Sequence, residues 1–262
     1  MRRFSADYLE ATREGMWVDS RAALSPLELD THERVLDVGC GTGELTSVLR
    51  AETDGEVVGL DADRDLLEHA DQPVVQGDAL TLPFRDDAFD LVVCQALLIN
   101  LPDPAAAVRE FARVASDLVA AVEPDNSAVS VTSTVDPEER LARRARRLYL
   151  RGVETDVALG ADAADAFETV GLTDVSTRRY DHERTVDPPY TETDVEAARR
   201  KASGEGIETD RETLLAGDAT PEDVDRLRQA WRSMGRDVIE QMQEDDYHRR
   251  ETVPFFVTVG RV

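Results

Sequence analysis

Three closely spaced glycines with carboxylates on both sides are the residues of this sequence that favour ligand binding most clearly. The β-branched run Arg34–Val38 leads into Gly39-Cys40-Gly41-Thr42-Gly43, and helical spacing resumes at Leu45. A glycine-rich turn between a strand and a helix lets the backbone approach a nucleotide-like ligand. The spacing that binds a dinucleotide requires a further glycine at position 44, which is Glu44 here.

The charge of this turn discriminates between ligands. Glu44 falls at the start of the expected helix, where a pyrophosphate otherwise binds, and Asp37 adds a second carboxylate just before the turn. Both would repel a diphosphate, whereas a ligand with a cationic centre would not be repelled. We therefore expect a nucleotide-like ligand that carries positive charge.

The elements that must position this turn alternate along the chain. Strand-like runs cover 34–38, 57–61, 73–76, 89–94 and 118–122, and helical patterns cover 45–49, 64–70 and 104–115. Alternation of this kind predicts right-handed βαβ crossovers. The sequence therefore predicts an α/β fold with a doubly wound, parallel sheet.

The run from Val35 to Gly43 resembles the first motif of class I S-adenosylmethionine-dependent methyltransferases, especially the small-molecule subgroup called type 11. Three further motifs recur in order, and the resemblance covers roughly residues 30–125. They are Asp61, Gly77-Asp78-Ala79 with Leu82-Pro83-Phe84, and Phe89–Gln95 followed by Leu101-Pro102-Asp103-Pro104. The sequence departs from the family at Ala115-Ser116-Asp117, where members usually have Lys-Pro-Gly-Gly.

The resemblance implies a Rossmann-like sheet of seven strands, mostly parallel, with an antiparallel last strand. S-adenosylmethionine would be the cofactor, with Asp61 on its ribose hydroxyls and Asp78 on its adenine amino group. The full set of expected cofactor-binding residues is Asp37, Gly39, Cys40, Gly41, Gly43, Asp61, Ala62, Asp78, Ala79 and Gln95. Neither Cys40 nor Cys94 has metal-ligand partners at a suitable spacing, so no metal is implied.

Outside the sheet, the chain divides into further segments. Residues 1–30 read as helical, and the resemblance implies that they form an N-terminal lid. Tyr8 and Trp17 would then close over the cofactor; the alternative is that both are plain core residues. Residues 31–186 and 252–262 form the expected methyltransferase domain. Residues 187–251 form a helical cap between the last two strands, and we expect the substrate pocket beneath it.

Methyl transfer from a sulfonium needs mainly alignment and exclusion of water. A general base is required only when the nucleophile keeps its proton. His182 and His248 flank the expected cap and are the candidates, although a solvated role explains either of them more simply.

Composition restricts the partners. The 262 residues carry a net charge of −25, which repels nucleic acid and anionic membrane unless a local basic patch intervenes. Only Lys201 among the 30 basic residues is a lysine. Because molar salt shortens the Debye length to about 3 Å, such a surface favours a high-salt cytoplasm and a halophilic source. The longest apolar stretch is too short to span a bilayer, and no export signal is evident, so we expect a cytoplasmic protein.

Two features suggest nucleic acid. Asp187-Pro188-Pro189-Tyr190 spells a motif that amino-group DNA methyltransferases use, but the position it would require is already taken by the strand ending at Gln95. Five arginines share one face of a helix over 137–151, either as an anion site or as a solvated face paired with carboxylates. They are Arg140, Arg143, Arg144, Arg147 and Arg151.

The sequence therefore predicts a methyltransferase that acts on a small molecule. The alternatives are a methyltransferase for tRNA or protein, an NAD-dependent oxidoreductase, and a non-catalytic binder of S-adenosylmethionine. The methyl acceptor and the oligomeric state stay open.

Overall fold

The computed structural model describes residues 16–19 and 21–262, so Tyr8 and most of the expected lid lie outside the described residues. The chain forms two compact units. Unit 1 comprises the described residues up to Asp125, together with Leu159–His182 and Pro254–Val262. Unit 2 comprises Asn126–Ala158 and Glu183–Val253.

Unit 1 is built on the predicted parallel sheet. Its strands lie in the order β3-β2-β1-β4-β5-β8, and β7 also pairs with β8. The first five are mutually parallel, whereas β8 runs antiparallel to β5. Their bounds are β1 Arg34–Val38, β2 Glu56–Asp61, β3 Val74–Gln76, β4 Phe89–Gln95, β5 Ala115–Pro124, β7 Thr173–Val186 and β8 Arg249–Arg261. The reversal in strand order beside β1 places the ends of β1 and β4 next to each other, which is where ligands bind in such sheets.

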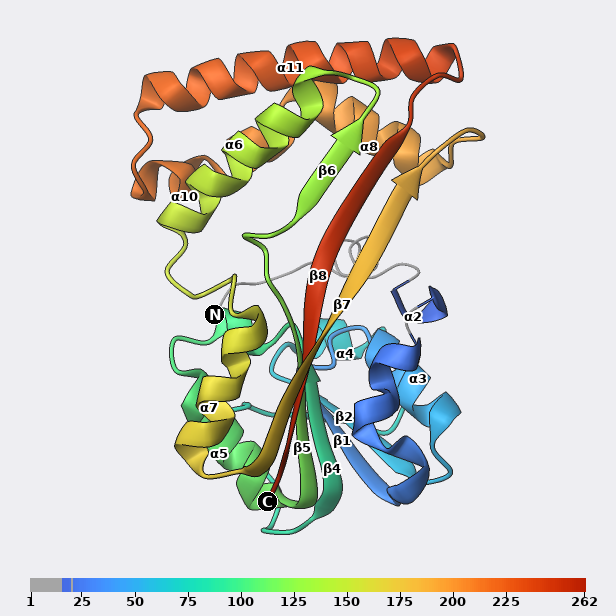
Figure 1. Ribbon diagram of the computed structural model, residues 1–262, viewed down its shortest axis with the longest axis vertical. Coiled ribbons are helices and arrows are strands. Elements are labelled where there is room, and N and C mark those ends of the chain that lie inside the picture. Colours follow the sequence, from blue (N-terminus) through green and yellow to red (C-terminus); the bar gives the residue numbers. More distant parts are fainter. Residues whose placement is uncertain (1–15, 20) are drawn as a thin grey trace. The chain divides into compact units, whose positions relative to one another are not determined.

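Helices cover both faces of this sheet (Figure 1). On one face, α5 (Pro104–Val114) and α7 (Ala163–Val170) bury Phe111 and Phe167 against Leu36 of β1. On the other face, the 3₁₀ helix η1 (Arg21–Leu27) and α3 (Glu44–Glu52) bury Leu24 and Leu49 against Val35. Successive residues of β1 thus enter opposite cores, as a strand buried on both faces requires.

Three shorter elements complete unit 1. They are α2 (Met16–Asp19), α4 (Arg64–Leu67) and the 3₁₀ helix η3 (Leu98–Asn100), besides single 3₁₀ turns at Leu29–Thr31 and Gly160–Asp162. Strand β5 begins at Ala115, directly after α5, and not at Leu118 as the apolar run indicated. The departure from the family motif at residues 115–117 is therefore accommodated by a longer strand.

Unit 2 has its own apolar core. Its helices are α6 (Pro137–Gly152), α8 (Glu192–Ser203), α9 (Glu205–Thr209), α10 (Arg211–Ala216) and α11 (Pro221–Gln243). They bury residues such as Leu141, Leu214, Leu227 and Val238. The short strand β6 (Ser130–Ser133) pairs with the first residues of β8. Thr191 and Thr220 begin α8 and α11 with complete capping boxes.

The structure differs from the expected fold in two respects. Within the part of the chain that the structure describes, the sheet has eight strands and not seven. The additional strand is β6, which is polar and gave no strand signal in the sequence. Unit 2 also includes residues 126–158, which the sequence analysis assigned to the sheet domain, because Val135 and Leu141 enter its core. Among the described helices, none combines the length and the apolar character that a membrane span needs.

Candidate cofactor and acceptor site

The glycine turn after β1 has the geometry that only glycines adopt without strain. Gly39, Gly41 and Gly43 have φ angles of 74°, 57° and 93°. The backbone N–H groups of Gly39 and Cys40 both donate to the carbonyl oxygen of Leu60, at 2.6 and 3.0 Å. This ties the turn to the end of β2. A Cβ atom on Gly43 would lie 3.2 Å from that of Ala70, so the turn also packs closely on its outer side.

Asp61, the last residue of β2, connects the turn to the next loop. Its Oδ2 accepts a hydrogen bond from the N–H of Gly41 at 2.9 Å, and its Oδ1 accepts one from Asp63 at 2.8 Å. Its carbonyl oxygen accepts from Gly77 at 3.0 Å. The half-buried carboxylate is thus fixed in place, and each oxygen keeps a lone pair for a ligand hydroxyl.

The neighbouring candidates follow from this connection. Asp78 is exposed, and only its Oδ1 is used among the described residues, by the N–H of Leu80 at 2.9 Å. Its second oxygen can accept from an amino group. Ala79 is buried in the core, and Ala62 is exposed, with its carbonyl oxygen accepting from the Gln76 side chain at 3.2 Å. Asp61 and Asp78 are therefore brought to one edge of the sheet.

Two further carboxylates border the turn, as the sequence predicted. Asp37 is buried on β1 and accepts from the Thr46 hydroxyl at 2.6 Å. Glu44 is the first residue of α3, and it accepts from the Thr42 hydroxyl at 2.6 Å. Their negative charge at this helix start opposes a diphosphate and suits the sulfonium of S-adenosylmethionine.

Gln95, the last residue of β4, contacts the first described residues of the chain. Its Oε1 accepts from the indole Nε1 of Trp17 at 3.3 Å, and its Nε2 lies 3.1 Å from the sulfur of Met16. All three side chains are buried. The described end of the expected lid thus packs on the strand next to the glycine turn.

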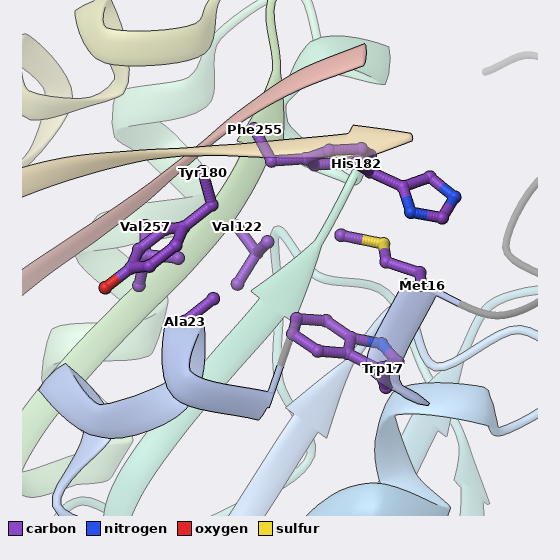
Figure 2. Close-up of a pocket in the computed structure, with 8 residues that line it drawn as sticks. All are labelled: Met16, Trp17, Ala23, Val122, Tyr180, His182, Phe255 and Val257. Atoms are coloured by element: carbon purple, nitrogen blue, oxygen red, sulfur yellow. The ribbon is translucent and has the colours of Figure 1, made fainter. Parts of the chain in front are cut away.

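A narrow, partly open pocket begins at this contact. Figure 2 shows Tyr180 at one end of it and His182 beside Met16 at the other. The lining residues are Met16, Trp17, Ala23, Val122, Tyr180, His182, Phe255 and Val257. The walls are therefore apolar and aromatic, with two side chains that can exchange a proton. None of the lining residues lies between 187 and 251, where the sequence placed the cap over the pocket.

The two candidate histidines have different surroundings. His182 is buried in the cavity wall, with its ring 6.5 Å from that of Phe255. His248 is half-exposed in unit 2, and its Nδ1 lies 2.7 Å from an oxygen of Asp187. Of the two histidines, only His182 lines this pocket.

The cysteines are packing residues. Cys40 is buried against Gly59, where an added Cβ would lie 2.9 Å from its sulfur. Cys94 points toward β5 and donates to Glu123 at 3.7 Å. Burial, followed by the charge of Glu123, raises the pKa of the Cys94 thiol well above its ordinary value. No cluster of three or more His, Cys, Asp or Glu residues within 16–19 and 21–262 is arranged to hold a metal ion.

Sequence reasoning missed Glu123. This residue of β5 is fully buried, and burial raises the pKa of its carboxyl to about 7 even though three backbone N–H groups donate to it. The donors are Leu97, Leu98 and Ile99, at 3.1, 2.9 and 3.3 Å. A glutamate that ends an otherwise apolar run was the available signal.

The features that suggested nucleic acid have structural roles in unit 2. The Tyr190 hydroxyl donates to the carbonyl oxygen of Tyr247 and accepts from its N–H, each at 3.0 Å, so this residue ties the loop after β7 to the segment before β8. Three of the five arginines on α6 are paired with carboxylates. These are Arg143 with Glu139, Arg144 with Asp223 at 3.4 Å, and Arg151 with Asp218 at 2.7 Å. The face is thus largely neutralised.

Comparisons with known proteins match the segment that contains the glycine turn to methyltransferases. A family model described as a methyltransferase domain matches residues 36–117. The demethylmenaquinone methyltransferase of Lactiplantibacillus plantarum is 39% identical over 107 residues, which cover 36% of this chain and 45% of that protein. An uncharacterized methyltransferase of Schizosaccharomyces pombe is 33% identical over 99 residues, covering 31% and 36%. The chain spans about half the length of the demethylmenaquinone methyltransferases that it matches.

Solved structures share the fold. The YcgJ protein of Bacillus subtilis has a TM-score of 0.53 at 18% identity, covering 92% of this chain and 96% of that chain. A chain from the complex of the Haloferax volcanii Trm112 methyltransferase activator has a TM-score of 0.52 at 18% identity, covering 98% and 94%. Residues 36–117 therefore match a methyltransferase domain, and the described residues share the fold of these solved structures.

Proposed function

We propose that this chain transfers the methyl group of S-adenosylmethionine to a small molecule bound in the cavity beside Gln95. The observation that carries the proposal is the position of Gln95. It ends the strand next to the glycine turn, and its side chain contacts both Met16 and Trp17 of the cavity wall. One side chain thus separates the cofactor region from the acceptor cavity.

The residues around the glycine turn fit the cofactor. The turn at Gly39–Gly43 would face its amino-acid and sugar portions, Asp61 would hold the ribose hydroxyls, and Asp78 would accept from the adenine amino group. Asp37 and Glu44 supply negative charge near the positive centre. When bound, S-adenosylmethionine supplies an electrophilic methyl group on a positively charged sulfur.

The chain's own residues would align the acceptor with the methyl group and exclude water from the site. Methyl transfer would require the acceptor's nucleophilic atom to be held in line with the carbon–sulfur bond that breaks, away from water. Buried Met16 and Trp17 would exclude water from this step. Where the acceptor still carries a proton, His182 is the side chain in the cavity wall best suited to take it.

The lining favours an apolar or aromatic acceptor. Six of the eight side chains are apolar or aromatic without a titratable group, and no arginine or lysine lines the cavity among the described residues. Demethylmenaquinone is the first acceptor to assay, because the curated relatives are named for it. The neutralised arginine face of α6 gives no support to tRNA.

The test has two stages. Melting temperatures are measured in molar potassium chloride with S-adenosylmethionine, with NADH and with neither. We expect stabilisation by S-adenosylmethionine alone, whereas stabilisation by NADH alone would replace the proposal with an oxidoreductase. Release of S-adenosylhomocysteine is then measured with demethylmenaquinone, other small aromatic acceptors, bulk tRNA and peptides. Turnover with tRNA or peptides only would refute the small-molecule assignment, and binding without turnover on any acceptor would favour a non-catalytic binder.

A further inference from the structure

Glu123 forms a buried anchor beneath the turn that follows β4. Its Oε1 accepts hydrogen bonds from the N–H groups of Leu97 and Leu98, and its Oε2 accepts one from Ile99. The residue is fully buried, so each of these bonds lacks competition from water. Leaving a buried N–H without an acceptor is costly, and three of them converge on this one carboxylate.

The turn that Glu123 holds begins at a strained residue. Ala96 has a φ of 49°, in the left-handed region that residues with a side chain seldom adopt. Its N–H donates to the carbonyl oxygen of Val122, the residue before Glu123, at 2.9 Å. Such backbone conformations persist only where the surrounding structure holds them in place. Here two consecutive residues of β5, Val122 and Glu123, do so by hydrogen bonds.

The turn then touches the glycine turn. A Cβ atom added to Gly39 would lie 3.0 Å from Cδ1 and 3.1 Å from Cδ2 of Leu97, so the Leu97 side chain packs directly on the backbone of Gly39. Gly39 also has a positive φ of 74°. The position of Leu97 therefore limits where the start of the glycine turn can lie.

We propose that Glu123 is a positioning residue for the cofactor. It fixes the turn at 97–99 by hydrogen bonds, and the Leu97 side chain in that turn then fixes the position of the glycine turn. Glu123 does not touch the cofactor in this scheme. The inference rests on the proposed function, because it assumes that the glycine turn binds S-adenosylmethionine. It adds β5 to the elements that determine cofactor affinity.

The experiment compares cofactor affinity with stability in three variants. Glu123→Gln keeps the shape but replaces one acceptor oxygen by an NH₂ donor that faces the N–H of Ile99. Leu97→Ala leaves Glu123 in place and removes the contact with Gly39, whereas Leu97→Met keeps most of the volume. Glu138→Gln is the matched control, since Glu138 is equally buried and hydrogen-bonded but lies in unit 2.

Dissociation constants for S-adenosylmethionine are measured by calorimetry above the Glu123 pKa of about 7, at a temperature where circular dichroism shows each variant folded. We expect Glu123→Gln and Leu97→Ala to weaken binding about tenfold, Leu97→Met to restore it, and Glu138→Gln to lower the melting temperature without changing the dissociation constant. If Glu123→Gln does not fold, the test is the comparison of the dissociation constants of Leu97→Ala and Leu97→Met. Wild-type affinity in folded Glu123→Gln and Leu97→Ala would overturn the inference. A wild-type chain that does not bind the cofactor would instead overturn the proposed function.

Discussion

The indole of Trp17 donates a hydrogen bond to the side-chain oxygen of Gln95 at 3.3 Å, across a separation of 78 residues. Both residues are buried, and Trp17 also lines the cavity that holds His182. Trp17 is therefore held at the end of β4 by a specific polar contact in addition to apolar packing.

Replacing Trp17 by Phe should weaken binding of the acceptor more than binding of the cofactor. The substitution keeps an aromatic ring but removes the donor to Gln95, and one buried hydrogen bond of this kind contributes about 1 kcal/mol. We expect the KM for the acceptor to rise about fivefold, with a smaller change in the dissociation constant of S-adenosylmethionine. Trp231→Phe in unit 2 is the control and should change neither. Equal effects of the two substitutions on the KM for the acceptor would contradict the assignment of Trp17 to the acceptor site.

Replacing Asp61 by Asn should directly weaken binding of the cofactor. The carboxylate accepts from Gly41 and Asp63 with different oxygens, and asparagine can satisfy only one of them while also losing the charge. We expect the dissociation constant of S-adenosylmethionine to rise at least about tenfold, as for the loss of a charged hydrogen bond. Asp63→Asn is the control, because asparagine caps α4 as well as aspartate does. Unchanged affinity in Asp61→Asn would contradict the assigned role.

Sequence patterns were sufficient for the sheet and the turn. The alternation of strands and helices predicted β1 to β5, because buried parallel strands are short apolar runs between helical periods. The glycine spacing and Glu44 placed the turn and the start of α3 correctly. Helix α8 lies within the helical segment expected over 187–251, where Thr191 caps its start and Gly204 its end.

Strand β6, the cavity and the contacts of Glu123 could not be predicted, because they depend on tertiary contacts that a sequence pattern does not show. Strand β6 is polar and too short to show a period, so it was missed. The residues that line the cavity come from β5, β7, β8 and the N-terminal segment, and their meeting depends on strand order. Glu123 gains its role only because the turn at 97–99 folds back over it. The function of the cap and the boundaries of the lid stay predictions.

The buried carboxyl of Glu123 should make stability depend on pH. Burial raises its pKa from 4.5 to about 7 in the folded chain, so the folded state holds this proton more tightly than the unfolded state. The stability that protonation contributes is complete at acid pH and is lost as the pH rises through about 7. The loss is on the order of 3 kcal/mol relative to Glu123→Gln, which cannot ionise.

The measurement is the free energy of unfolding of both proteins by denaturant across this pH range, in molar salt. The nearby Cys94 thiol stays neutral throughout, because its pKa is also raised. Parallel pH profiles for the wild type and Glu123→Gln would contradict the assignment.

The net charge of −25 should make the fold dependent on salt. At low ionic strength the carboxylates repel one another, and molar potassium chloride screens this repulsion beyond about 3 Å. We expect the melting temperature to rise on the order of 10 °C between dilute and molar salt, equivalent to about 3 kcal/mol in a chain of this size. Sucrose of equal osmolality favours burial without screening and should have a smaller effect. A melting temperature that does not change with salt would exclude adaptation to a high-salt cytoplasm.

Lys201, the single lysine of the chain, should be essential to the stability of unit 2. Its ammonium lies 2.6 Å from Oε1 of buried Glu138 and 3.1 Å from the Tyr247 hydroxyl. Burial alone would raise the pKa of Glu138, but the Lys201 charge holds it below its ordinary value. Lys201→Met leaves the carboxylate with Arg249 as its remaining cation, and we expect a loss of about 3 kcal/mol in denaturant unfolding. Adding Glu138→Gln should recover most of that loss, because no unpaired charge then remains buried. If the double variant is as unstable as Lys201→Met, packing and not charge explains why this position is lysine.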